Sequence, residues 1–178
     1  TSNCSADISG EAVSQALLKV SPGYIRVDAD EATYPLHVIL RFELEQALIS
    51  GELAPADLPV AWNQRVVESL ALDPPDDRNG CLQDIHWYDG AFGYFPTYTL
   101  GAMAAAQLFQ AASDSIGPDD LHSALAKGDY APLTAWMRDN VHGKGRLYPS
   151  SNDLLQAATG APLSSNTFKA HIKARYLS

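Results

Sequence analysis

Apolar residues recur at intervals of three and four along most of this chain, which is the spacing of one face of an α-helix. The clearest case runs from Thr33 to Ile49, where one face carries Leu36, Ile39, Leu40, Leu44, Ala47 and Leu48. Thr33 is the expected N-cap of this helix and Pro35 is expected in its first turn, while Gly51 should end it. A shorter segment with the same spacing, residues 11–20, predicts a helix before it.

Proline near the start and glycine just past the end recur along the rest of the chain, as they do at the ends of real helices. Six further helices are therefore predicted: residues 55–72, Pro96 to about Ala112, 118–127, 132–142, Ser150 or Ser151 to Thr159, and Ser164 or Ser165 to Tyr176. The sequence shows neither a repeat period nor a clear linker. The expected fold is a single all-α segment over residues 1–178.

The segment from Tyr24 to Glu31 departs from this helical pattern. Ile25 and Val27 alternate with polar residues as they would in a strand, although a long helix follows. Arg26 lies among acidic neighbours and has two interpretations. It is either a surface arginine in a solvated charge cluster, or a guanidinium held by those neighbours for bidentate capture of a carboxylate.

A second unusual stretch, residues 81–101, combines aromatic residues with glycines and has neither helical nor strand periodicity. Such a sequence predicts a loop that is held in place by its own side chains. It also carries the polar residues Gln83, Asp84 and His86, and loops on rigid scaffolds often bear functional residues. The alternative is a buried corner in which the aromatics fill the core and His86 is a hydrogen-bonded core histidine.

Composition narrows the possible functions. The 178 residues are 46% hydrophobic and 19% charged, as expected for a globular protein with a substantial core. The net charge of −9, without a basic stripe, argues against nucleic-acid binding. The sequence holds no apolar run of the roughly 20 residues that a membrane helix needs. Cys4 and Cys81 form no disulfide framework, which favours a reducing, cytoplasmic setting.

Motifs for metal or nucleophilic chemistry are missing from the sequence, which contains no H-E-x-x-H, P-loop or G-x-S-x-G. None of the five histidines has a histidine four residues away, and His37 is expected to be structural. We therefore expect no metal or other cofactor in this chain itself. His86, the tyrosines and Arg26 remain as groups that could assist a reaction.

Three segments together resemble the thermostable (Taq-type) metallocarboxypeptidase family. The first contains the family's I-R-x-x-A-D-E signature, at Ile25–Glu31. The second contains L-Q-D-x-H-W and G-Y-F-P-T-Y, and the third is the tail HGKGRLYPSSNDLLQAATGAPLS. The resemblance covers nearly the whole chain from about Val13. Departures are small: Pro35 replaces a more usual Asn, and Cys81 replaces an aliphatic residue.

The resemblance implies a mostly helical protein with a deep groove, in which an H-E-x-x-H helix and a further glutamate hold a divalent metal, usually zinc. Those ligands precede the matching region, so this chain, which begins at Thr1 without a Met, looks like the C-terminal third of the enzyme and one wall of its groove. The implied activity is release of single C-terminal residues from peptides, often by a homodimer. On its own, the 178-residue chain is expected to be inactive.

The same resemblance gives roles to individual residues. His86 and Tyr94 would be catalytic, donating hydrogen bonds to the oxyanion. Arg26 would bind the terminal carboxylate of the substrate, with Asp30 and Glu31 orienting it or lining the groove. Gln83 and Tyr98 would contact substrate subsites.

A different class of function also fits the sequence. The chain could be a non-catalytic helical module for interaction or dimerisation. The helix that follows Pro96 is rich in alanine and glycine, and such a helix allows another helix to approach closely.

Overall fold

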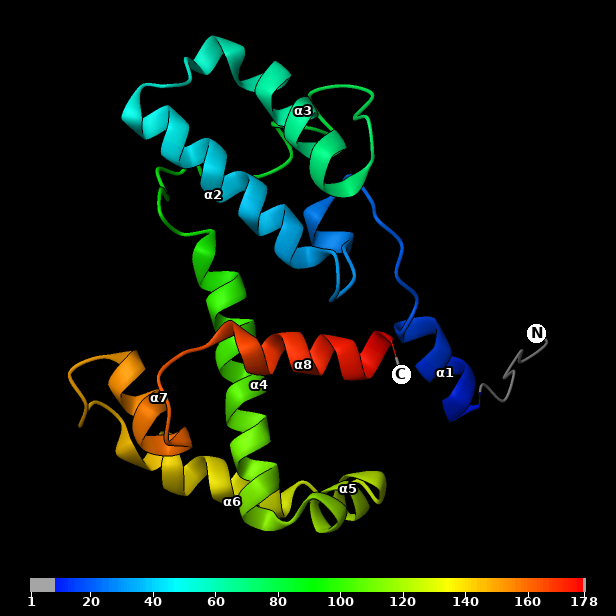
Figure 1. Ribbon diagram of the computed structural model, residues 1–178, viewed down its shortest axis with the longest axis vertical. Coiled ribbons are helices and arrows are strands. Elements are labelled where there is room, and N and C mark those ends of the chain that lie inside the picture. The colour runs from blue at the N-terminus through cyan, green and yellow to red at the C-terminus, as the bar shows by residue number, and fades with distance from the viewer. Residues whose placement is uncertain (1–8, 178) are drawn as a thin grey trace, which may run out of the picture. The chain divides into compact units, whose positions relative to one another are not determined.

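A computed structural model describes residues 9–177, and every regular element in that range is helical (Figure 1). The all-α prediction is confirmed. Cys4 lies outside the described residues. The chain divides into two compact units, and the boundary falls between Thr99 and Leu100. Unit 1 contains the described residues up to Thr99 together with Arg175–Leu177, and unit 2 contains residues 100–174. The expectation of a single segment stays a prediction.

Unit 1 is built around two long helices. Its elements are α1 (Gly10–Leu17), η1 (Arg26–Asp28), α2 (Tyr34–Ser50), η2 (Pro55–Asp57), α3 (Leu58–Leu70) and the start of α4 (Pro96–Ile116). As predicted, Thr33 occupies the N-cap position of α2, and Gly51 ends the helix in the left-handed conformation at φ +80°. The predicted 55–72 helix is a 3-10 turn followed by α3, because Pro59 has no N–H to donate and must lie in the first turn of a helix.

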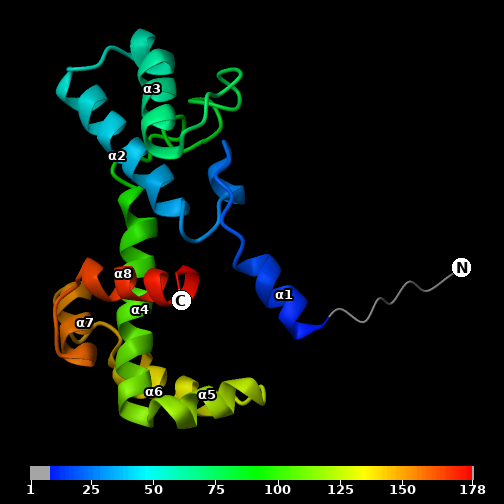
Figure 2. The same ribbon diagram turned by 45° about the vertical axis from the view of Figure 1, so that its right-hand side comes forward.

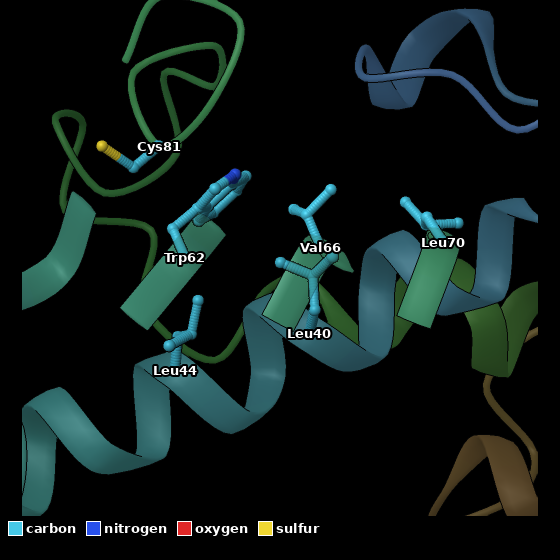
Figure 3. Packing of buried hydrophobic residues seen from close by; sticks show 6 residues of the cluster. All are labelled: Leu40, Leu44, Trp62, Val66, Leu70 and Cys81. Atoms are coloured by element: carbon cyan, nitrogen blue, oxygen red, sulfur yellow. The ribbon is translucent and has the colours of Figure 1, made fainter. Parts of the chain in front are cut away.

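The core of unit 1 lies between α2 and α3, which run side by side in Figures 1 and 2. Figure 3 shows its buried cluster: Leu40 and Leu44 from α2, Trp62, Val66 and Leu70 from α3, and Cys81 from the following loop. Burying each large apolar side chain contributes roughly 1.5–3 kcal/mol. Burial also raises the pKa of the Cys81 thiol.

Residues 71–95 connect α3 to α4 without a regular element, as the aromatic and glycine-rich pattern predicts for residues 81–95, whereas residues 96–101 of that stretch already belong to α4. The loop is packed through its aromatic rings. Trp87 makes edge-to-face contacts with Trp62 in the core and with Phe95, at centroid distances of 6.3 and 5.9 Å. Phe95 is only 1% exposed. The loop is therefore joined to the helix pair by apolar packing as well as by polar contacts.

The strand-like alternation at Ile25–Asp28 is not a strand in the structure. Arg26–Asp28 form the 3-10 turn η1. Two alternating pairs are too short to specify a strand, and the Arg26 side chain is drawn inward by an ion pair with a residue of the 71–95 loop.

Unit 2 contains the rest of α4, α5 (Pro118–Ala126), α6 (Ala131–Asn140), η3 (His142–Lys144), α7 (Ser151–Thr159) and α8 (Ser165–Tyr176) as far as Ala174. Helix α4 continues past the expected Ala112 and stops before Gly117, whose φ of +105° is unfavourable for other residues. Gln107 on α4 is buried and donates to Ala161 O and Pro162 O at 3.0 and 3.1 Å. It thereby holds the α7–α8 connection against α4.

Candidate functional site

Unit 1 contains an open cavity of about 530 Å³. Polar and aromatic side chains from η1, the 71–95 loop and the start of α4 line it: Arg26, Val27, Gln83, Asp84, Ile85, His86, Asp89, Ala91, Tyr94 and Tyr98. Five of the seven residues predicted for the site are in this list. The structure thus brings Arg26, Gln83, His86, Tyr94 and Tyr98 together.

Asp84 organises the inner side of this cavity. One oxygen, Oδ1, accepts from Arg26 Nε and Nη2 at 3.0 and 2.8 Å. The other, Oδ2, accepts from Arg41 Nε at 2.6 Å. Arg26 is 7% exposed and Arg41 is 0% exposed, so both cations are largely withdrawn from water. The triad of Arg26, Arg41 and Asp84 carries a net charge of +1, which the exposed carboxylate of Asp89 in the cavity lining offsets.

The pKa directions in this triad follow from its geometry. Burial acts to raise the pKa of Asp84, but the Arg41 charge and the hydrogen bonds from both arginines leave it below its usual range. Burial lowers the pKa of Arg41 to about 10 despite its contact with Asp84. For Arg26 the effect of burial is outweighed by the Asp84 bond, and its pKa is raised. All three groups are charged at neutral pH.

Arg26 is also surrounded by aromatic rings. Its guanidinium carbon lies 5.2 Å from the Tyr98 centroid and 5.9 Å from that of Tyr34. Arg26 Nη1 donates to Tyr34 Oη at 2.8 Å. Of the five N–H groups of the guanidinium, Asp84 takes two and Tyr34 takes one. Two remain for a ligand, one on each terminal nitrogen.

His86, Tyr94 and Tyr98 form an aromatic group at the cavity wall. His86 Nε2 lies 2.9 Å from Tyr98 Oη. The ring centroids of His86 and Tyr94 are 5.7 Å apart, and those of Tyr94 and Tyr98 are 5.4 Å apart. The Tyr94 side chain is half exposed, whereas His86 Nδ1 is shielded from solvent and makes no hydrogen bond. Burial raises the pKa of Tyr98, which keeps its hydroxyl protonated at neutral pH.

Gln83 uses both of its polar atoms on the main chain. Its Oε1 accepts from Arg26 N at 2.9 Å, and its Nε2 donates to Tyr24 O at 3.0 Å and also to Asn79 O and Gly80 O. The side chain therefore joins the segment around Arg26 to the start of the loop. Its expected contact with substrate stays a prediction.

Asp30 and Glu31 do not line the cavity. Asp30 accepts from the amides of Ser21, Ala32 and Thr33 at 2.8–3.0 Å. Burial acts to raise its pKa, but these hydrogen bonds outweigh burial and leave the pKa lowered. Glu31 is exposed and forms an ion pair with Arg175 at 3.2 Å. The acidic partner of Arg26 is Asp84, and the substrate-binding role of Asp30 and Glu31 stays a prediction.

Two residues of α2, one helical turn apart, were not predicted as part of the site. Arg41 holds Asp84, as described above. Glu45, which is 6% exposed, accepts from Trp87 Nε1 at 2.7 Å and from the Gly93 amide. The sequence feature that could have revealed them is a charged residue at two positions on the inward face of a long helix, where apolar residues are expected.

His37 is buried, as expected for a structural histidine. It is 1% exposed and its carbonyl accepts from Arg41 Nη1 at 2.7 Å. Burial, aided by the charges of Arg41 and Arg26, lowers the pKa of His37 to about 4. His37 is therefore neutral at physiological pH.

Within residues 9–177, no three His, Cys, Asp or Glu side chains come together in a way that could hold a metal ion. The described residues therefore do not fit a resident metal centre. In the same range, no helix is both long and apolar enough to cross a membrane.

Comparison with known proteins gives consistent results. Thermostable carboxypeptidase 1 of Thermus thermophilus is 43% identical over 170 residues, which are 96% of this chain and 33% of the relative. Carboxypeptidase 1 of Bacillus subtilis is 42% identical over 157 residues, 88% of this chain and 31% of that protein. This chain thus spans about a third of the length of these relatives.

A solved structure, metallocarboxypeptidase 1 of Trypanosoma cruzi, matches with a TM-score of 0.93 and 37% identity, over 97% of this chain and 36% of that one. The family model of the carboxypeptidase Taq (M32) metallopeptidases matches residues 1–176. The cavity residues of η1 and the 71–95 loop lie within this matched region. The chain belongs to the carboxypeptidase Taq (M32) family of metallopeptidases.

Proposed function

We propose that this chain supplies the substrate-binding and oxyanion-stabilising residues of a metal-dependent carboxypeptidase that releases single C-terminal residues from peptides. The observation that carries the proposal is the way Arg26 is held at the cavity. Its bonds to Asp84 and Tyr34 fix the guanidinium beside Tyr94 and Tyr98 and leave two of its N–H groups for a ligand. A guanidinium held in this way can bind the carboxylate at the end of a peptide.

Arg26 is the group we assign to the terminal carboxylate. Its two remaining N–H groups lie on different terminal nitrogens, so they can bind the two oxygens of one carboxylate. Asp84 and Tyr34 fix the plane of the guanidinium. Little side-chain entropy is then lost when the substrate binds.

Tyr94 and His86 are the groups we assign to the carbonyl oxygen that becomes negatively charged. Tyr94 lines the cavity and is half exposed, so its hydroxyl can donate directly. His86 acts through Tyr98: a hydroxyl can accept from His86 Nε2 and donate its own proton to a substrate oxygen. Donors placed in advance where charge develops stabilise the transition state more than the ground state.

The remaining parts of this function belong to the whole protein. Because the described residues do not fit a metal ion, we infer that the family's divalent metal, zinc in our expectation, is held by residues outside this chain. We infer peptide substrates and a homodimer from the family, and a cytoplasmic location from the two cysteines, which form no disulfide framework. The 178-residue chain alone should then neither bind zinc tightly nor cleave peptides.

The direct test is a C-terminal release assay on the full-length gene product, with and without a chelator. We expect single C-terminal residues to be released and the activity to be lost on chelation. Tyr94→Phe and His86→Ala should each lower kcat by on the order of a hundredfold. Arg26→Ala should mainly raise KM, because the carboxylate is bound in the ground and transition states alike.

Tyr88→Phe is a suitable control for Tyr94→Phe, because Tyr88 is 67% exposed and does not line the cavity. If a full-length, metal-loaded protein releases no C-terminal residue, the catalytic function is wrong. The chain would then be better described as the helical interaction module.

A further inference from the structure

The segment from His86 to Tyr94 forms a compact turn within the 71–95 loop. The Ala91 amide donates to His86 O at 2.8 Å, and the Gly90 amide donates to Trp87 O at 3.1 Å. Gly93 has a φ of +77°, which returns the chain towards α4. The segment therefore begins and ends with the two residues that the proposed function assigns to the carbonyl oxygen.

One side chain of α2 binds both arms of this turn. Glu45 Oε2 accepts from Trp87 Nε1 at 2.7 Å, and Glu45 Oε1 accepts from the Gly93 amide. Trp87 directly follows His86 in the sequence, and Gly93 directly precedes Tyr94. A single carboxylate thus holds the neighbour of each assigned residue.

We propose that Glu45 is a positioning residue, which sets the separation of His86 and Tyr94 by binding Trp87 and Gly93 at the same time. This inference rests on the proposed function for its catalytic consequence. That Glu45 holds the turn in place follows from its hydrogen bonds with Trp87 and Gly93, whatever the protein catalyses.

The chemistry of the contact favours a carboxylate at position 45. Both neighbouring groups are N–H donors, and an ionised carboxylate offers an acceptor oxygen to each of them. Glutamine has one acceptor oxygen and one NH₂ group, so Glu45→Gln can keep only one of the two bonds. The NH₂ group would face the second N–H donor, so either Trp87 or Gly93 would lose its hydrogen bond to residue 45.

Glu45 acts apart from the triad that binds the carboxylate. Asp84 is held by Arg41, one helical turn earlier on α2. Loss of the Glu45 contacts should therefore loosen residues 86–94 while Arg26 and Asp84 stay in place. The expected consequence is a lower kcat with little change in KM.

Hydrogen–deuterium exchange on the full-length protein tests the holding of the turn. Glu45→Gln should speed amide exchange in residues 86–94 by about tenfold or more, because local opening becomes easier. Exchange in the α2–α3 pair should stay unchanged, which separates positioning from general destabilisation. Glu43→Gln is the matched control on the same helix: Glu43 is exposed, and its carboxylate lies 3.6 Å from Arg65.

A double-mutant cycle on kcat tests the catalytic consequence, with each variant confirmed as folded by circular dichroism at the assay temperature. Glu45→Gln should lower kcat by on the order of tenfold, and Trp87→Phe should lower it less because the Gly93 bond remains. In the double variant, the effects on kcat should combine to less than the product of the single effects, because the Trp87–Glu45 bond can be lost only once. Glu43→Gln should match the wild type.

Each outcome has a distinct meaning. Unchanged exchange in residues 86–94 of Glu45→Gln overturns the holding of the turn. Faster exchange with an unchanged kcat overturns the positioning role. If the wild-type protein is inactive, the proposed function fails and the catalytic consequence fails with it, while the exchange experiment still decides whether Glu45 holds the turn.

Discussion

Arg41 connects the core of unit 1 to its cavity through its contact with Asp84. Arg41 Nε lies 2.6 Å from Asp84 Oδ2, and the guanidinium carbon lies 4.6 Å from the centroid of the core residue Trp62. The Arg41 side chain has no surface exposed to solvent. The shape of the cavity and the packing of the α2–α3 pair therefore depend on one another.

Removing the charge of Asp84 should destabilise unit 1 strongly. In Asp84→Asn, Arg41 stays buried without a compensating carboxylate, and losing one member of a buried pair costs about 3–5 kcal/mol. Urea denaturation would measure the loss. Asp89→Asn is the control, since Asp89 also lines the cavity but is exposed, and it should change the unfolding free energy by less than about 0.5 kcal/mol.

Two residues of α2 should differ sharply in the cost of truncation to alanine. Leu44 is 4% exposed in the core, whereas Ile49 is 68% exposed. Leu44→Ala should cost about 2–5 kcal/mol because it leaves a cavity, and Ile49→Ala should cost less than about 0.5 kcal/mol. Similar denaturation midpoints for the two variants would contradict the assigned core.

His37 should make stability fall with acid. Its pKa is lowered to about 4 in the folded chain, against about 6.5 when unfolded, so the unfolded state binds more protons between these values. The contribution of this group is fully present above pH 6.5 and is lost as the pH falls towards 4, on the order of 3 kcal/mol.

The measurement for His37 is the unfolding free energy of wild type and His37→Gln across that pH range. The difference between the two should shrink as the pH falls. His122→Gln, at an exposed position of α5, is the control, and its unfolding free energy should differ from that of the wild type by the same amount at every pH. A constant difference for His37→Gln would contradict the assigned environment.

Two glycine-to-alanine substitutions should have opposite effects on the stability of the folded chain. Gly93 has a φ of +77°, where an alanine is strained by about 1–2 kcal/mol, although its Cβ would meet no atom within 4 Å. Gly101 lies inside α4, and a Cβ there would also meet nothing within 4 Å. Gly93→Ala should lower the melting temperature, and Gly101→Ala should raise it through about 0.5–1 kcal/mol of helix propensity.

The helices could be predicted from the sequence because their signals are local. Apolar spacing correctly placed Leu40 and Leu44 on the buried face of α2, but Ile39, predicted on the same face, is 45% exposed, because the buried face is rotated towards Arg41 and Glu45. Gly51 and Gly160 ended α2 and α7 at the expected positions, both with φ of +80°. The 71–95 loop was also predictable, since its glycines and aromatics oppose both helical and strand periodicity.

The contacts of the site could not be predicted in the same way. Asp84 lies 58 residues from Arg26 and 43 from Arg41, and spacing along a helix carries no information about such pairs. The acidic residues adjacent to Arg26 were the natural candidates for its ion-pair partner. Asp30 instead accepts hydrogen bonds from the amides of Ala32 and Thr33, just before α2. The family resemblance placed Arg26, His86 and Tyr94 in one site, while Glu45 and Arg41 required the fold.

The sequence separation of the Arg26–Asp84 pair also bears on the order of assembly. Joining residues 58 apart requires closure of a long chain segment, whereas α2 and α3 are joined by the short connection of residues 51–57. We expect the helix pair to form early in folding and the cavity to close afterwards. Asp84→Asn should then accelerate unfolding far more than it slows refolding, and stopped-flow kinetics would show the asymmetry.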